Sequence, residues 1–388
     1  MSRTLEASLA RCTELVEDMS FAGVRSHKEK TGEGAVGYFP VYSPLEIYRA
    51  AGYLPVAVHG GGNQIEITAA DSRFGSFICS VVKSTMELAM KGHLDVLDGM
   101  VFHDICDSAR NLAYLFERNF KDKLFMEYIH LPQKPDGPAA VAFLRGEYER
   151  IYARLAGLRG RKPLAGALRE AIAVYNMNRA LHGRLYRLRQ ERPQDVPTSQ
   201  LSLLTRAGGL LPVGQHNQLL GECLAGFEAR RAKPRDGIRV VVEGAFCEQP
   251  PIDLLNLLDA VGCFVVDDDL LIGRRWFGPD IPAAGDPLTA LAEAYMKSPV
   301  PSSVRHNPGV PRTQALIDRV RRTKAQAVIF MYAKFCEPGL FDYVLFKDVL
   351  EKEGIPHLLI EFEEKMWTFD KARMEVETFV ESLLFEYV

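Results

Sequence analysis

Short apolar runs of strand length alternate with segments of helical character near the start of the chain. The sequence predicts strands over residues 37–42, 54–58, 74–78, 100–102 and 123–129, with helix-like segments between them. Neighbouring parallel strands need a long crossover connection, and a helix usually provides it. The alternation therefore predicts a parallel sheet with helices on both faces.

The same alternation returns in the last third of the chain, over residues 238–242, 263–266, 327–332 and 357–361. The stretch from residue 139 to residue 231 instead has a helical pattern almost throughout. We therefore expect an α/β protein with two doubly wound (Rossmann- or flavodoxin-like) parallel-sheet domains joined by a helical segment. The expected units are residues 1–138, 139–232 and 233–388.

The composition is that of an ordinary soluble protein. Of its 388 residues 47% are hydrophobic and 25% charged, and the net charge is -3. This charge does not favour nucleic acid or an anionic membrane surface as a partner. The longest apolar stretches are too short to cross a bilayer, and the first residues lack the pattern of a signal peptide. We expect a cytoplasmic protein.

The chain has seven cysteines, an odd number scattered widely along a chain expected in the cytosol, so a disulfide framework is not expected. Three of them, Cys12, Cys223 and Cys263, fall inside predicted helices or open a strand, and we expect them in the apolar core. The remaining four follow a predicted strand and precede a helix: Cys79, Cys106, Cys247 and Cys336.

Ligands of open parallel sheets bind beyond the carboxyl ends of the strands. Thiols gathered there suit soft metals and iron–sulfur clusters, and a helix N-terminus favours the thiolate. The chain has no Cys-x-x-Cys pair, which argues against a ferredoxin-type cluster or a zinc ribbon. Spacing alone leaves two interpretations open, a metal site or ordinary buried cysteines.

Several longer motifs are more specific. They are Tyr38-Phe39-Pro40-Val41-Tyr42-Ser43-Pro44-Leu45-Glu46-Ile47, Gly60-Gly61-Gly62, Asp98-Gly99-Met100-Val101-Phe102, Ile105-Cys106-Asp107, Gly244-Ala245-Phe246-Cys247-Glu248-Gln249-Pro250-Pro251, Val266-Asp267-Asp268-Asp269 and Phe335-Cys336-Glu337-Pro338. From about residue 20 to its end, the chain resembles the benzoyl-CoA reductase / 2-hydroxyglutaryl-CoA dehydratase family. It looks most similar to the cluster-binding, gamma-type subunits of ATP-dependent benzoyl-CoA reductases.

The resemblance implies an oxidoreductase subunit of anaerobic aromatic degradation, which carries low-potential electrons to benzoyl-CoA or an analogue and yields a cyclohexadienoyl-CoA. It implies a cubane-type [4Fe–4S] cluster held by Cys79, Cys106 and Cys336. Cys247 is a further candidate, as a fourth ligand or as a thiol near the cluster. An iron left open would accept water, substrate, another residue or a bridge to a second cluster.

The resemblance also implies partners. These are a paralogous cluster-binding subunit, an ATPase with its own [4Fe–4S] cluster, ferredoxin and an acyl-CoA substrate. The chain has no G-x-x-x-x-G-K-[ST] loop, so we expect the partner to hydrolyse ATP. Two alternatives stay open: a subunit of a 2-hydroxyacyl-CoA dehydratase, and a subunit that only relays electrons or serves as a scaffold.

A few other residues are candidates for the site. The candidate catalytic residues are Glu248, beside Cys247, and His103, before Cys106. Each has a structural alternative. Glu248 could cap a helix or lie at the surface, and His103 could be a hydrogen-bonded residue of the core. Other segments offer ligand contacts or plain structural roles. Gly60–Gly62 could let the backbone approach a ligand closely or form a plain turn. Asp267–Asp269 could contact a ligand or cap a turn. Arg274 and Arg275 could contact the phosphates of CoA or form surface ion pairs.

Overall fold

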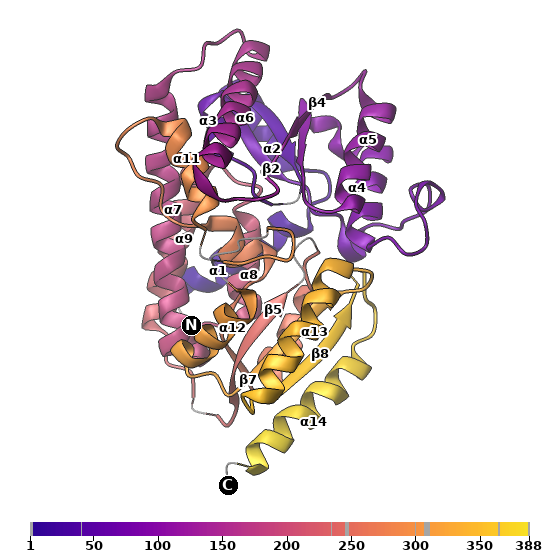
Figure 1. The fold of residues 1–388 in the computed structure, drawn as a ribbon, viewed down its shortest axis with the longest axis vertical. Coiled ribbons are helices and arrows are strands. Elements are labelled where there is room, and N and C mark those ends of the chain that lie inside the picture. Colours follow the sequence, from indigo (N-terminus) through magenta and orange to yellow (C-terminus); the bar gives the residue numbers. More distant parts are fainter. Residues whose placement is uncertain are drawn as a thin grey trace.

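The fold of the chain consists of two four-stranded parallel sheets joined by long helices (Figure 1). The computed structural model describes residues 3–39, 41–233, 235–244, 248–298, 300–305, 311–363 and 365–386. The strand orders are β2-β1-β3-β4 and β6-β5-β7-β8, and every strand pair is parallel. In each sheet the strand that comes first in the sequence lies inside, and the strand order runs outward from it in both directions, as in a doubly wound fold. The predicted fold class is confirmed.

The first sheet and its helices span residues 22–129. Their elements are α2 (Ala22–Thr31), β1 (Gly34–Tyr38), α3 (Leu45–Ala50), β2 (Tyr53–Ala57), η1 (Gly62–Gln64), η2 (Asp71–Arg73), α4 (Ser80–Met90), η3 (His93–Val96), β3 (Gly99–His103), α5 (Asp107–Phe120) and β4 (Phe125–Ile129). The inner strands β1 and β3 are buried along their whole length, which is why they consist of small and apolar residues.

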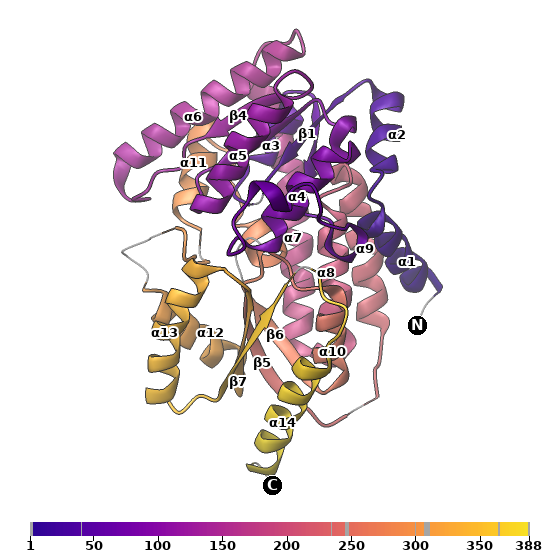
Figure 2. The same ribbon diagram turned by 90° about the vertical axis from the view of Figure 1, so that its right-hand side faces the viewer.

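Helices fill the stretch between the two sheets, as the sequence predicts. They are α6 (Gly137–Leu158), α7 (Ala165–Glu191), η4 (Pro193–Asp195), α8 (Thr198–Ala207) and α9 (Val213–Ala229). Helix α7 packs against α3 of the first half and β6 of the second, so it runs along both (Figures 1 and 2). The leading helix α1 (Arg3–Glu17) packs on α8 and α9.

The second half repeats the plan of the first. Its elements are β5 (Ile238–Gly244), α10 (Ile252–Ala260), β6 (Cys263–Asp268), η5 (Leu271–Arg275), α11 (Pro287–Met296), α12 (Arg312–Thr323), β7 (Ala327–Ala333), α13 (Glu337–Lys352), β8 (His357–Phe362) and α14 (Asp370–Glu386). Helix α11 packs on α6, in the core of the first half. Contacts therefore cross between the halves, and the three domain boundaries stay a prediction.

Two expectations about local structure are wrong. The pattern up to about residue 32 predicts one amphipathic helix, but the segment forms two, α1 and α2, because the chain turns at Phe21, whose backbone is left-handed. Residues 74–78 do not form a strand but a loop after η2. Phe77 in this loop is 66% exposed, and among the described residues the first sheet consists of β2, β1, β3 and β4.

A buried histidine joins α9 to the helices around it. His216 is fully buried, with its Nε2 atom 3.1 Å from the backbone oxygen of Leu204 and its Nδ1 atom 3.0 Å from the side-chain nitrogen of Asn178. This pattern suits the neutral ring, which donates to Leu204 and accepts from Asn178. Burial lowers the pKa of His216 to about 4.

We expect this histidine to make the fold sensitive to acid. In the unfolded chain a histidine titrates near pH 6.5, so His216 is neutral in both states above that pH. Between pH 6.5 and pH 4 the unfolded chain binds a proton at this residue and the folded chain does not, so the free energy of unfolding decreases as the pH falls. Between pH 7 and pH 5 the His216→Gln variant should lose about 2 kcal/mol less unfolding free energy than the wild type. Urea unfolding at the two pH values measures this, and the exposed His130→Gln is the control. Equal losses in wild type and His216→Gln would contradict the assignment.

Candidate functional site

Three of the candidate cysteines occupy the same structural position. Cys79, Cys106 and Cys336 are the residues immediately before α4, α5 and α13. The latter two follow β3 and β7 closely, as predicted, whereas a loop precedes Cys79. A helix N-terminus has exposed backbone N–H groups and a partial positive charge, which favours negatively charged groups there.

These three cysteines line one cavity of about 260 Å³ between the two halves. Cys79 and Cys336 are buried and Cys106 is half-buried. The rest of the lining includes Phe77, Ile78, Asp107, Ser108, Asn111, Glu248, Ala333, Phe335, Glu337 and Pro338. The structure therefore brings Cys336 together with two thiols that lie more than 200 residues earlier in the sequence.

The electrostatics of the cavity disfavour three bare thiolates. Burial raises the pKa of the Cys79 thiol well above its usual value, and the nearby Glu248, Cys106 and Cys336 raise it further. A positively charged group among the thiols reverses this balance. Within the described residues, no three His, Cys, Asp or Glu side chains are arranged around a single metal ion. An iron–sulfur cluster makes a different demand, because its thiolates bind different irons and stand further apart.

Glu248 joins the second half of the chain to the start of α4. Its carboxylate lines the cysteine cavity, is 1% exposed, and accepts hydrogen bonds from the Ser80 hydroxyl and, at 3.3 Å, from the backbone N–H of Val81. It therefore caps the helix that Cys79 precedes, from a distant part of the sequence. The capping alternative for Glu248 is confirmed, and its place in the cavity lining leaves a chemical role open.

The other candidates near the cysteines are placed less favourably. His103 ends β3, is 1% exposed, and does not line the cysteine cavity. Burial lowers its pKa to about 3, so its ring is neutral at physiological pH. Cys247 lies outside the described residues. The roles of both stay predictions.

The cysteines expected in the core lie there. Cys12 and Cys223 are fully buried in the cluster formed by α1, α7, α8 and α9, and Cys263 is buried at the start of β6. Burial raises the pKa of Cys12 to about 11 and that of Cys223 to about 12, so both stay protonated and unreactive.

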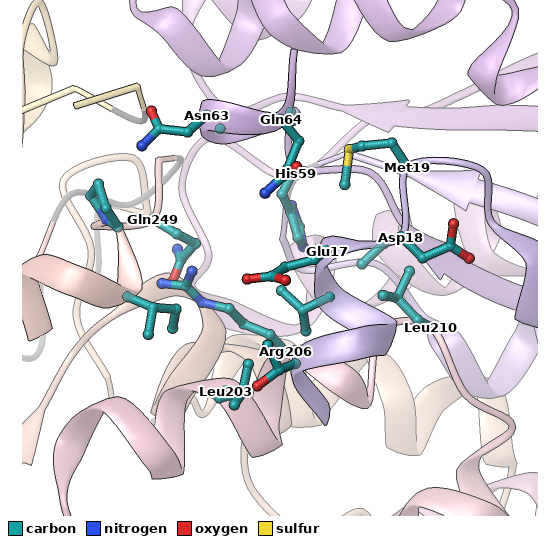
Figure 3. Close-up of a pocket in the computed structure, with 18 of the residues that line it drawn as sticks. Glu17, Asp18, Met19, His59, Asn63, Gln64, Leu203, Arg206, Leu210 and Gln249 are labelled. Carbon is teal, nitrogen blue, oxygen red and sulfur yellow. The ribbon is translucent and has the colours of Figure 1, made fainter. Parts of the chain in front are cut away.

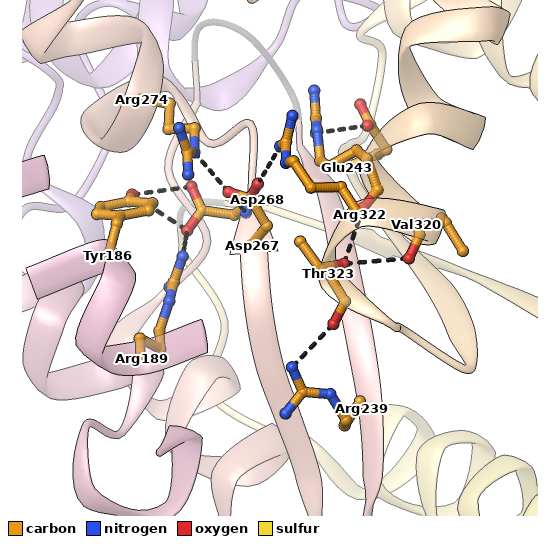
Figure 4. A network of polar contacts seen from close by, with 11 residues as sticks. Tyr186, Arg189, Arg239, Glu243, Asp267, Asp268, Arg274, Val320, Arg322 and Thr323 are labelled. Atoms are coloured by element: carbon orange, nitrogen blue, oxygen red, sulfur yellow. Dashed lines mark hydrogen bonds and ion pairs between the residues drawn. The ribbon is translucent and has the colours of Figure 1, made fainter. Parts of the chain in front are cut away.

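The aspartates at the end of β6 form ion pairs within the protein (Figure 4). Asp268 accepts hydrogen bonds from Arg189, at 2.6 Å, and from Tyr186, at 3.1 Å. Asp267 lies 2.5 Å from Arg274 and 3.0 Å from Arg322.

Asp269 completes this row of ion pairs. It pairs with the buried Arg275 and accepts a hydrogen bond from the backbone N–H of Gly244. Arg274 and Arg275 thus both pair with carboxylates of this chain, which favours ion pairing over contacts with CoA phosphates. For the same reason Asp267–Asp269 are best interpreted as structural residues and not as ligand contacts.

Sequence reasoning missed Ser80, which supplies the hydroxyl that holds Glu248. Its position directly after Cys79, in the first turn of a helix, was a weak signal that backbone and hydroxyl donors gather there.

The fold and the cavity define a two-sheet α/β protein with a cysteine-lined site between its halves. The chain belongs to the family described as "2-hydroxyglutaryl-CoA dehydratase, D-component", whose model matches residues 40–383. It is 35% identical over 377 residues to one of the subunits of the benzoyl-CoA reductase of Thauera aromatica, covering 97% of each chain.

Two dehydratase subunits are also similar to this chain. The beta subunit of the lactoyl-CoA dehydratase of Anaerotignum propionicum is 31% identical, covering 99% of this chain and 100% of the relative. The (R)-phenyllactyl-CoA dehydratase beta subunit of Clostridium sporogenes is 29% identical, covering 93% and 94%. These names place the relatives in multi-subunit enzymes of two reaction types. None of the described helices is long and apolar enough to span a membrane.

Proposed function

We propose that this chain is the iron–sulfur subunit of an ATP-dependent aromatic acyl-CoA reductase, with Cys79, Cys106 and Cys336 as ligands of a [4Fe–4S] cluster. The observation that supports this best is the shared cavity, which these thiols line from three helix N-termini. Thiolates are the usual ligands of such clusters. Cys247 stays a candidate for a fourth ligand or a nearby thiol.

When bound, such a cluster supplies electrons at a potential that no side chain reaches. The substrate ring gains two electrons and two protons and becomes a cyclohexadiene thioester. The chain contributes the surroundings. Buried Cys79 and Cys336 and the wall formed by Ile78 and Ala333 keep water away, which tunes the potential of a bound cluster.

Partners are part of the proposal. Phe77 and Phe335 line the cavity, yet they are 66% and 40% exposed. Large exposed apolar side chains beside a site mark contact surfaces. We propose that this mouth is covered by the paralogous subunit. A separate ATPase with its own cluster, fed by ferredoxin, then supplies the electrons, since this chain lacks a phosphate loop.

Glu248 is the proposed proton-handling residue of the cavity. The Glu248→Gln variant keeps the size of the side chain and one acceptor oxygen for the backbone N–H of Val81 but removes the acid, so we expect it to retain iron while kcat falls about 100-fold or more. Iron content and turnover of the complex measure this. Glu337→Gln, which also lines the cavity, is the matched control and should have little effect. Wild-type turnover in Glu248→Gln would reject the proton role; His103 would then be tested in the same way.

A second candidate function is a subunit of a 2-hydroxyacyl-CoA dehydratase, favoured by the family description and by the two dehydratase relatives. Assays of the purified complex separate the two. ATP consumed in proportion to a reduced ring supports the reductase. Water elimination from a 2-hydroxyacyl-CoA with only catalytic ATP supports the dehydratase. Substrate bound only at the partner's cluster supports a relay role for this chain.

A further inference from the structure

We propose that a second cavity, of about 280 Å³ and lined by His59, Arg206 and Gln249, binds a small monocarboxylate with an apolar body. This cavity shares no lining residue with the cysteine cavity. The proposal therefore does not depend on iron or on the proposed electron transfer.

The cavity forms where four parts of the chain meet. These are the end of α1, the loop after β2, helix α8, and the start of α10 (Figure 3). The loop after β2 contains Gly60 and Gly62, both with positive φ, which allow it to turn away from the strand end. The cavity thus lies beyond the carboxyl end of a parallel strand, where α/β folds bind ligands.

Two uncharged side chains offer hydrogen-bond donors to this cavity. Gln249 is 6% exposed; its Oε1 atom accepts from the backbone N–H of Ile272 at 3.3 Å, and its Nε2 atom has no partner among the described residues. Both ring nitrogens of His59 are likewise buried without a partner there. Buried donors without partners are costly, so a ligand that supplies acceptor atoms stabilises them.

Arg206 adds a positive charge to these donors. Figure 3 shows its side chain extending toward Gln249, and it donates a 2.6 Å hydrogen bond to the backbone oxygen of Pro250. Burial, with the charge of Arg206, lowers the pKa of His59 to about 3, so the ring stays neutral and offers one N–H. A guanidinium together with these hydrogen-bond donors matches the oxygens of a carboxylate.

The rest of the lining is largely apolar and the space is small. Val16, Phe21, Leu203, Leu210 and Ile252 contribute the apolar wall. Pockets for drug-sized ligands measure about 300–1,000 Å³, so the volume here suits a single ring or a short branched chain.

Acidic residues at the rim narrow the choice of ligand further. Glu17 and Asp253 line the cavity and are exposed, while Asp18 accepts hydrogen bonds from the backbone N–H groups of Ser20 and Ala22. Their charges repel polyanions, so the phosphates of CoA do not suit this entrance. A free acid with one negative charge and an apolar body suits it better.

Two adjacent residues of the chain line the two cavities, one residue in each. Glu248 lines the cysteine cavity and Gln249, the next residue, lines the second one. The loop that carries Gly61 also touches α4, where the Gly61 N–H donates to Ser84 at 3.2 Å. A ligand held by Gln249 therefore also fixes the residue that caps α4.

Benzoate is the probe for the test, because it combines one carboxylate with one ring. Calorimetric titration of the anaerobically purified protein should give saturable binding of one benzoate per chain, with a Kd of about 1 mM or tighter. Gln249→Glu, which places a negative charge among the donors, should weaken binding at least tenfold. Gln133→Glu, exposed and outside the cavity, should leave it unchanged.

Leu203→Trp provides an independent variant, because it reduces the space inside the cavity without removing a hydrogen-bond donor or adding a charge. It should also weaken binding at least tenfold, and it decides the matter if Gln249→Glu fails to fold. Iron content, measured on each variant, reports separately on the cysteine site. No saturable binding by the wild type, or binding that survives Leu203→Trp, would overturn the proposal.

Discussion

Replacing Cys79, Cys106 or Cys336 singly by Ala should remove most of the iron from the anaerobically purified complex. The three thiols line one cavity, each at the start of a helix, so losing one leaves a proposed cluster with two protein ligands. Loss of a group that merely supports a metal ligand already costs about 10–100-fold in metal affinity, and loss of a ligand costs more. Iron and acid-labile sulfide per chain are the measurements.

The matched controls are Cys12→Ala and Cys223→Ala. Both thiols are fully buried in the apolar cluster of α1 and α9 and do not line the cysteine cavity, so their loss costs some stability but no iron. Full iron retention in Cys79→Ala, Cys106→Ala or Cys336→Ala would remove that residue from the ligand set.

Neutralising Asp268 should cost far more stability than neutralising an exposed carboxylate of the described part. Arg189 is 1% exposed and pairs with Asp268 at 2.6 Å, while Tyr186 donates to the same carboxylate (Figure 4). Asp268→Asn keeps the size but leaves the guanidinium buried without a counter-charge. Breaking a buried pair in this way costs about 3–5 kcal/mol.

Urea unfolding of wild type and variant measures this loss. The matched control is Asp348→Asn, which breaks the exposed pair of Asp348 with Lys352 at 2.6 Å on α13. An exposed pair contributes about 0–1 kcal/mol, so the two variants should differ several-fold. Equal, small losses would mean that water reaches Arg189 and that the pair is not buried in solution.

The sequence predicted the architecture because strands buried on both faces read as continuous apolar runs, as residues 240–242 and 327–332 do. The same signal failed at residues 74–78. There Phe77 and Ile78 line the cysteine cavity and Phe74 packs against the core from a loop, positions that apolar character alone does not distinguish from a strand.

Part of the candidate site was also readable from the sequence. The position of Cys106 and Cys336 between strand and helix predicted where they lie. The bonds from Ser80 and Val81 to Glu248, and the pairing of Asp267 with Arg322, join residues far apart in the chain. No local pattern encodes such pairs, so only the structure reveals them. The glycines after β2 offered a close backbone approach to a ligand, but a plain turn was the favoured interpretation.

Anomalous diffraction at the iron absorption edge, from anaerobically grown crystals of the complex, shows whether this chain holds a cluster between its halves. We expect iron density in the cavity within bonding distance of the Cys79, Cys106 and Cys336 sulfurs. A fully loaded complex with no iron in that cavity, or with iron held by other residues of this chain, would contradict it.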